Sequence, residues 1–183
     1  MFVFIFSFVV VLSLLTSKAV LSLNHQELPS ALIAAIRQDF LQYRENYPST
    51  WTDSKAHRVF FVDLNSDRVK EAILYPAGGL MCNNRSCEIF IYTKFGNKYK
   101  KISAHLGGSR NEPSIGILKT SNQGWYDLAT RFFDYETRTE KWSRVSYGSR
   151  GYTDSPLVIV PNPRTILEYS SGVETDLKKF LPN

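Results

Sequence analysis

Four oxygen-bearing side chains lie at alternating positions in one short polar stretch, and their spacing suits a metal ion. They are Asp63, Asn65, Asp67 and Glu71, at relative positions 1, 3, 5 and 9. Calcium takes about six to eight oxygen ligands, and side chains that alternate along a tight loop can converge on one ion, with a backbone carbonyl at relative position 7. Val69 occupies that position. The pattern therefore predicts a calcium site formed by these five residues.

Two positions differ from the usual calcium loop. Glycine is usual at relative position 6, where the loop turns sharply, and a bidentate glutamate is usual at relative position 12. This chain has Arg68 and Leu74 there. The alternative interpretation is a β-turn whose Asp and Asn side chains accept hydrogen bonds from the turn's own backbone. In both interpretations, the apolar runs at 59–62 and 72–75 predict a strand on each side of the turn.

The same turn resembles a loop of known protein families. The run DLNSD from Asp63, followed by EAI from Glu71, resembles the D-L-N-G-D-G-x-x-E-A-I loop of FG-GAP and VCBS segments, with Ser66 and Arg68 in place of the two glycines. Over about residues 57 to 152, the chain is similar to small exported bacterial proteins that carry this loop, a short Cys-to-Cys loop and then Gly-Trp-x-Asp-Leu. Those features are here Cys82, Cys87 and residues 124–128. The resemblance implies an exported protein and a fold, and it says little about activity.

The first residues have the composition of a secretory signal. Residues 1–15 are almost wholly apolar, and Ser17 and Ala19 put small residues at the third and first positions before a cut after Ala19. The alternative is an uncleaved anchor, but the apolar run is shorter than the ~20 residues that span a bilayer. We expect a signal peptide over 1–19, a domain over 20–154 and a C-terminal extension over 155–183. The protein is then periplasmic or secreted, with no membrane span after cleavage.

Two cysteines in an exported chain predict a disulfide between Cys82 and Cys87. The alternatives are metal ligation and a redox pair, but a lone C-x4-C without nearby histidines suits zinc poorly and differs from C-x-x-C. The net charge is +5. Its cations are scattered and form no basic run with interleaved aromatics, so nucleic acid is not the expected partner. A weak preference for an anionic surface, such as lipopolysaccharide or an acidic partner, is compatible with this charge.

Hydrophobic periodicity predicts an α+β fold. Within residues 28–46, apolar residues recur at helical spacing at Leu32, Ile33, Ile36, Phe40 and Tyr43. From 57 to 152, short apolar or alternating runs are separated by turns, which predicts antiparallel strands. We expect a meander sheet of six to seven strands, packed on one face by the N-terminal helix. A short C-terminal helix is expected within 173–181.

Aromatic residues on the late strands are candidates for a binding surface. Together with the disulfide loop over 78–87, they predict contacts to a partner through Arg85, Trp125, Tyr126, Trp142 and Tyr147. The alternative is that cross-strand aromatic pairs stiffen the sheet.

Signals for catalysis are weak. The histidines are His25, His57 and His105, and the chain has no G-x-S-x-G or H-E-x-x-H motif. We therefore expect a non-catalytic binding protein of the bacterial envelope, with a protein partner and no cofactor, such as an inhibitor or immunity protein. The first alternative is a calcium-dependent envelope or adhesion protein that uses the Asp63–Glu71 loop. The second alternative is a hydrolase, because a Ser-His-Asp set is defined by geometry and not by sequence order.

Overall fold

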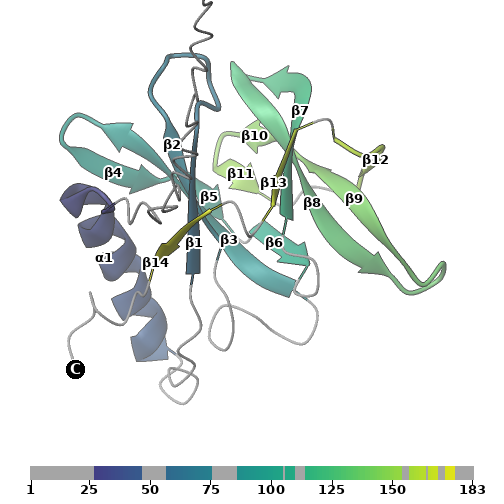
Figure 1. The fold of residues 1–183 in the computed structure, drawn as a ribbon, viewed down its shortest axis with the longest axis horizontal. Helices are drawn as coiled ribbons and strands as arrows, with labels where there is room; N and C mark the ends of the chain where they lie inside the picture. Colours follow the sequence, from purple (N-terminus) through teal and green to yellow (C-terminus); the bar gives the residue numbers. More distant parts are fainter. Residues whose placement is uncertain are drawn as a thin grey trace, which may run out of the picture.

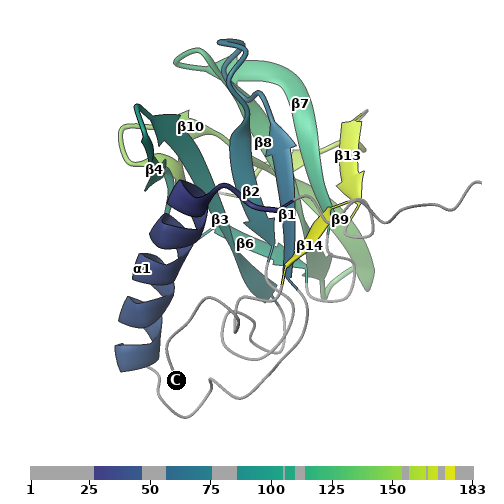
Figure 2. The same cartoon turned by 60° about the vertical axis from the view of Figure 1, so that its left-hand side comes forward.

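The computed structural model describes residues 27–46, 57–75, 86–104, 106–109, 114–153, 157–163, 165–168 and 172–175. These residues form three layers, in which helix α1 (Ser30–Asn46) packs on a central sheet and the central sheet packs on a second sheet (Figure 1). Figure 2 shows α1 lying across one side of the central sheet, with the strands of the second sheet on the other side. No helix in this described part of the chain has both the length and the apolar character needed to cross a bilayer.

The central sheet is built around two hairpins that lie next to each other. Its strand order is β14-β1-β2-β3-β4, and β6 also pairs with β3. The strands are β1 (His57–Val62), β2 (Glu71–Tyr75), β3 (Ser86–Phe95), β4 (Lys98–Lys101), β6 (Leu106–Ser109) and β14 (Val173–Thr175). The pairs β1–β2, β2–β3 and β3–β4 are antiparallel. This arrangement places the predicted acidic turn at the tip of the β1–β2 hairpin.

The second sheet has the order β12-β9-β8-β7-β13, and a small sheet of order β10-β11-β5 lies beside it. The larger sheet contains β7 (Ser114–Asn122), β8 (Trp125–Asp134), β9 (Thr139–Val145), β12 (Ile159–Val160) and β13 (Thr165–Glu168). The small sheet contains β5 (Ser103–Ala104), β10 (Tyr147–Gly148) and β11 (Gly151–Thr153), and its β11–β5 pair is parallel. Through β5, the small sheet connects the two larger ones along the chain.

Strand β2 shows why the molecule has three layers. All five of its residues are buried. Ala72 and Leu74 point to the α1 side, where they pack with Leu32, Ile36 and Phe40. Ile73 and Tyr75 point to the other side and belong to the core shared with β7 and β8. A strand covered on both faces reads as a continuous apolar run, and the A-I-L-Y sequence fits that rule.

The predicted α+β fold is wrong. The described residues contain one helix and are otherwise mostly strand, and the strands form several sheets instead of one meander. The expected single sheet ends at β4 and β6, and the strands after residue 113 fold back as a separate sheet over its second face. The physical reason is burial, because Ile73, Ile89 and Ile91 would leave that face apolar and exposed without the second layer. The predicted N-terminal helix is confirmed as α1.

The C-terminal residues also differ from the prediction. Val173–Thr175 form strand β14 beside β1, and no helix begins there; the remainder of the expected helix lies outside the described residues. The segment assigned to a C-terminal extension supplies β12 to β9, β13 to β7 and β14 to β1. Residues after 154 therefore contribute strands to both larger sheets.

Candidate functional site

The β1–β2 loop is held by hydrogen bonds from its own backbone to its own side chains. Asp63 accepts the N–H of Asn65 at 3.3 Å with Oδ1 and the N–H of Arg68 at 2.9 Å with Oδ2. Asn65 Oδ1 accepts the N–H of Asp67 at 3.1 Å, and Asp67 Oδ1 accepts the N–H of Val69 at 2.7 Å. The Asn65 amide donates to Asp67 Oδ2 at 3.0 Å. These are the bonds expected from the β-turn interpretation, and they fix the shape of the loop.

Glu71 faces the core. Its side chain is buried, Oε2 accepts the N–H of Leu64 at 2.8 Å, and Oε1 accepts the Thr93 hydroxyl at 3.0 Å. Burial raises the pKa of the Glu71 carboxyl, and these two hydrogen bonds oppose that rise. In the described part of the chain, no three His, Cys, Asp or Glu side chains gather as a ligand set for a metal ion.

Two non-glycine residues of the loop adopt a left-handed backbone. Ser66 has φ 63° and Arg68 has φ 69°. They stand at the two positions where the resembled loop has glycine, which adopts positive φ without steric penalty. The backbone therefore follows a path suited to glycine, although the side chains at both positions are larger.

The loop also packs on the start of β8. The N–H of Tyr126 donates to the carbonyl of Leu64 at 2.7 Å, and the Ser66 hydroxyl donates to the Tyr126 hydroxyl at 3.1 Å. The DLNSD run and the Gly-Trp-x-Asp-Leu segment, which are far apart in sequence, thus touch in space. The two hydrogen bonds link the central sheet to the second sheet at this end of the molecule.

Three aromatic rings lie next to that contact. Trp125 stacks on Tyr147 with ring centroids 4.6 Å apart, and both rings meet Tyr152 edge-on. Tyr152 is buried and donates its hydroxyl to the Tyr126 carbonyl at 2.6 Å. Burial, and then the charges of Glu71 and Asp127, raise the pKa of the Tyr152 hydroxyl. Trp125 and Tyr147 remain partly exposed, so one side of their stack is available to solvent.

The predicted binding residues do not form one surface. Trp125, Tyr126 and Tyr147 gather at the loop end of the molecule. Trp142 lies on β9, is 3% exposed and packs under the Arg131 guanidinium, 4.9 Å from the ring centre. Arg85 lies outside the described residues.

Other predicted residues have different outcomes. Cys82 lies outside the described residues and Cys87 is buried near the start of β3, so the disulfide stays a prediction. His57 packs edge-on against Phe40, with centroids 6.1 Å apart. His25 and His105 lie outside the described residues.

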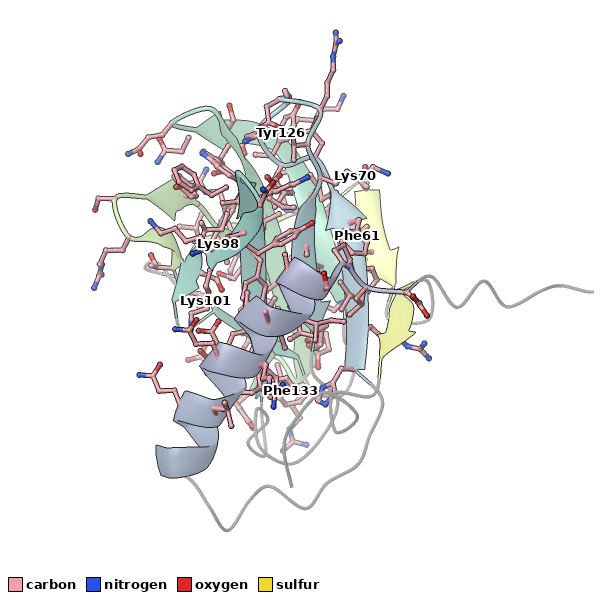
Figure 3. All side chains as sticks on the ribbon, turned by 90° about the vertical axis from the view of Figure 1, so that its left-hand side faces the viewer. Phe61, Lys70, Lys98, Lys101, Tyr126 and Phe133 are labelled. Atoms are coloured by element: carbon pink, nitrogen blue, oxygen red, sulfur yellow. The ribbon has the colours of Figure 1, made fainter. Side chains whose placement is uncertain are left out.

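A groove on the other flank of the loop was missed at the sequence level. It encloses about 670 Å³ beside β1, and its lining includes Phe61, Arg68, Val69, Lys70, Lys94 and Tyr99. Figure 3 shows Phe61 and Lys70 on the same side of the molecule, beside the first turn of α1. The only sequence signal was the basic composition of the loop end and of the β3–β4 hairpin, which does not reveal that these segments meet.

The groove is cationic. Arg68, Lys70 and Lys94 are exposed on its rim, and Glu27 is the acidic residue among those that line it. None of these three cations forms an ion pair with another described residue, whereas Lys101 of β4 pairs with Asp39 of α1 at 3.5 Å. Their charge therefore faces solvent, and the groove is suited to an anionic ligand.

Comparisons with known proteins give no relative: no protein-family model, curated protein or solved structure matches the chain. The chemistry of the loop, the aromatic stack and the groove is therefore the basis for assigning a function.

Proposed function

We propose that this chain is an exported, non-catalytic binding protein of the bacterial envelope whose partner is a protein, with inhibitor or immunity protein as the expected role. The observation that carries the proposal is the self-bonded loop. Asp63, Asn65 and Asp67 direct their side-chain oxygens to the loop's own backbone and amide groups. Arg68, Val69 and Lys70 are exposed on this loop, and Val69 is 40% exposed.

A loop that already has its bound shape binds with a smaller entropy loss. Ordering a flexible interface loop opposes association, so a preformed loop retains more of its contact energy as affinity. Inhibitor-type complexes typically change backbone conformation little on binding. The self-bonded loop fits this mode, because its shape depends on internal bonds and needs no contact from a partner.

Residues on both flanks of the loop support contact with a protein. Aromatic and arginine side chains are enriched at the energetic centres of protein interfaces. Trp125 and Tyr147 lie on one flank, and the cationic groove with Phe61 and Tyr99 lies on the other. Export remains part of the proposal, supported by the apolar segment over 1–15 and the Cys82–Cys87 spacing.

Partner capture tests the proposal. The protein, produced by export from its full sequence, is immobilised and exposed to envelope extract at several salt concentrations. The loop variant carries Val69→Asp with Lys70→Glu, and the matched control carries Arg150→Glu in the exposed β10–β11 turn. We expect a defined protein to be retained by the wild type and the control but lost by the loop variant. Retention of nothing at any salt, or equal retention by all three, contradicts the proposal.

Calcium-dependent binding is the second candidate, and one observation favours it. Ser66 and Arg68 keep the positive φ angles that suit the glycines of the resembled calcium loop. A calcium titration followed by melting temperature tests it, since a ligand that binds the native state must raise stability. Asp67→Asn is the control, because it removes one charge from the proposed ligand set. No rise at millimolar calcium, or an equal rise in the control, removes this candidate.

A further inference from the structure

We infer that the groove beside β1 binds an extended acidic segment of the partner protein. This inference rests on the proposed function, because it names the chemistry of the partner at that site. It is carried by three features of the groove: its charge, the edge of β1 that it exposes, and the apolar floor between them.

The charge comes from three separate places in the sequence. Arg68 and Lys70 belong to the β1–β2 loop, and Lys94 belongs to β3. Strand pairing brings them to one rim, and none forms an ion pair with another described residue. Carboxylates of a partner can accept charge-assisted hydrogen bonds from all three side chains. Glu27 gives the opposite charge at one point of the lining, so the groove favours a segment with spaced acidic residues over one dense acidic run.

The edge of β1 suggests an extended conformation for that segment. Strand β14 pairs with β1 through His57, Arg58 and Val59. From Phe60 to Val62, no strand of the described residues pairs with β1 on this side. An unpaired strand edge binds extended peptides through main-chain hydrogen bonds, and side-chain pockets beside it give specificity.

The floor of the groove is apolar and can receive the other side chains of such a segment. Phe61 points to the α1 side of the sheet, where it packs against the same cluster as Tyr99. Val69 is exposed at the loop end of the groove. In an extended chain, successive side chains point to opposite sides. The expected ligand therefore alternates acidic and apolar residues.

The β3–β4 hairpin offers a rival surface for anions of another class. Phe95 at its tip is 77% exposed, and Lys94, Lys98 and Lys100 are exposed around it. An exposed aromatic ring among lysines also fits an anionic membrane surface. The groove favours the peptide, because it is concave and borders a strand edge, whereas Phe95 lies at a turn. Membrane binding is one outcome of the test below.

The test uses three fluorescein-labelled peptides and the exported full-length product. The first alternates glutamate and valine, the second has glutamine for glutamate, and the third is the acidic peptide N-methylated at alternate residues. Binding is followed by fluorescence anisotropy at low and high salt. We expect the acidic peptide to bind more weakly as salt rises and the glutamine peptide to bind at least about tenfold more weakly. N-methylation should also weaken binding about tenfold, because it removes main-chain donors.

Charge-reversal variants locate the site. Lys70→Glu with Lys94→Glu should weaken the acidic peptide at least about tenfold. Lys119→Glu with Arg150→Glu makes the same charge change at exposed positions outside the groove, and it should change affinity less than about twofold. Equal losses in both double variants, or no binding of the acidic peptide at low salt, overturn the inference. Sedimentation with phosphatidylglycerol vesicles that depends on Phe95→Ser, without peptide binding, also overturns it and assigns the basic surface to lipid.

The two proposals fail separately. If envelope extract supplies a partner whose retention is unchanged by Lys70→Glu with Lys94→Glu, the acidic-segment inference fails and the proposed function stands. If no partner is retained, the proposed function fails whatever the peptides do.

Discussion

The carboxylate of Glu71 accepts the N–H of Leu64 at 2.8 Å inside the core. This bond joins the first residue of β2 to the start of the loop that precedes it, and Thr93 of β3 satisfies the other oxygen at 3.0 Å. Glu71 is thus the point at which the loop is attached to the central sheet. The residue has the spacing of a metal ligand in the sequence, but its position makes it a structural anchor.

The first prediction concerns Glu71→Gln. The glutamine oxygen can accept the Leu64 N–H, and its NH₂ group can donate to the Thr93 hydroxyl, so the fold should be retained. The native pKa of Glu71 is raised above its ordinary 4.5, so the wild type loses stability as pH rises from 4.5 through the native pKa. The glutamine variant has no such loss. Its advantage in free energy of unfolding should therefore grow over that pH range and then level off, as measured by urea unfolding.

Glu71→Ala is the contrasting variant. It leaves the buried Leu64 N–H without its acceptor, which should lower the free energy of unfolding by about 2 to 3 kcal/mol. A difference between wild type and Glu71→Gln that is constant with pH would falsify the assignment of the raised pKa to Glu71.

The second prediction concerns the left-handed residues of the loop. Arg68→Gly should stabilise the protein by about 1 kcal/mol, because glycine adopts φ near 69° without the Cβ clash. Arg68→Ala removes the same charge but keeps Cβ, so it should give no such gain. Ser66→Gly should gain less, because it also loses the hydrogen bond to the Tyr126 hydroxyl. Urea unfolding compares the three; an equal effect of glycine and alanine at residue 68 shows that charge and not backbone strain is responsible.

Residue order predicted the local elements well and the layers poorly. The helix with Leu32, Ile36 and Phe40 on one face and the hairpin turn at Gly96 both follow from short-range patterns. The second layer was signalled only by the continuous apolar run of β2, which differs from the alternation of a strand with one wet face. An alternating interpretation of the other strands concealed that signal.

The candidate site was predictable only in part. The turn and its side-chain oxygens are adjacent in sequence, so their self-bonding was an available interpretation. The groove could not be found in this way, because Arg68 and Lys94 meet only through the β1–β2–β3 pairing and its register. The burial of Glu71 likewise depends on Thr93, a residue of another strand.

The third prediction concerns the hydroxyl of Tyr152, which donates to the Tyr126 carbonyl. Tyr152→Phe should lower the free energy of unfolding by about 1 to 2 kcal/mol at neutral pH. Because burial raises the native pKa above the ordinary 10.0, the wild type loses stability as pH rises beyond 10, and the phenylalanine variant should lose less. Urea unfolding at neutral and alkaline pH measures both effects. Tyr147→Phe is the control, since its ring is partly exposed; if it matches Tyr152→Phe, the hydrogen bond is not the cause.

The last prediction tests whether the C-terminal residues are part of the folded core. Gly116 of β7 pairs with Ile166 of β13 and with Ala129 of β8. A Cβ at Gly116 would overlap the ring of Pro163 and lie 3.2 Å from the Ala129 Cβ. Gly116→Ala should therefore lower the free energy of unfolding by about 1 to 3 kcal/mol, because the added methyl overpacks this contact.

Two further variants make that result specific. Gly148→Ala adds the same methyl where no atom lies within 4 Å, so the melting temperature should hardly change. Adding Pro163→Ala to Gly116→Ala should restore part of the loss, because the ring that the methyl meets is gone, and the double-mutant cycle should show coupling of about 1 kcal/mol between the two sites. If Gly116→Ala is as harmless as Gly148→Ala, the chain around Pro163 does not pack on β7 in solution, and the strands after residue 154 are an appended segment and not a part of the sheets.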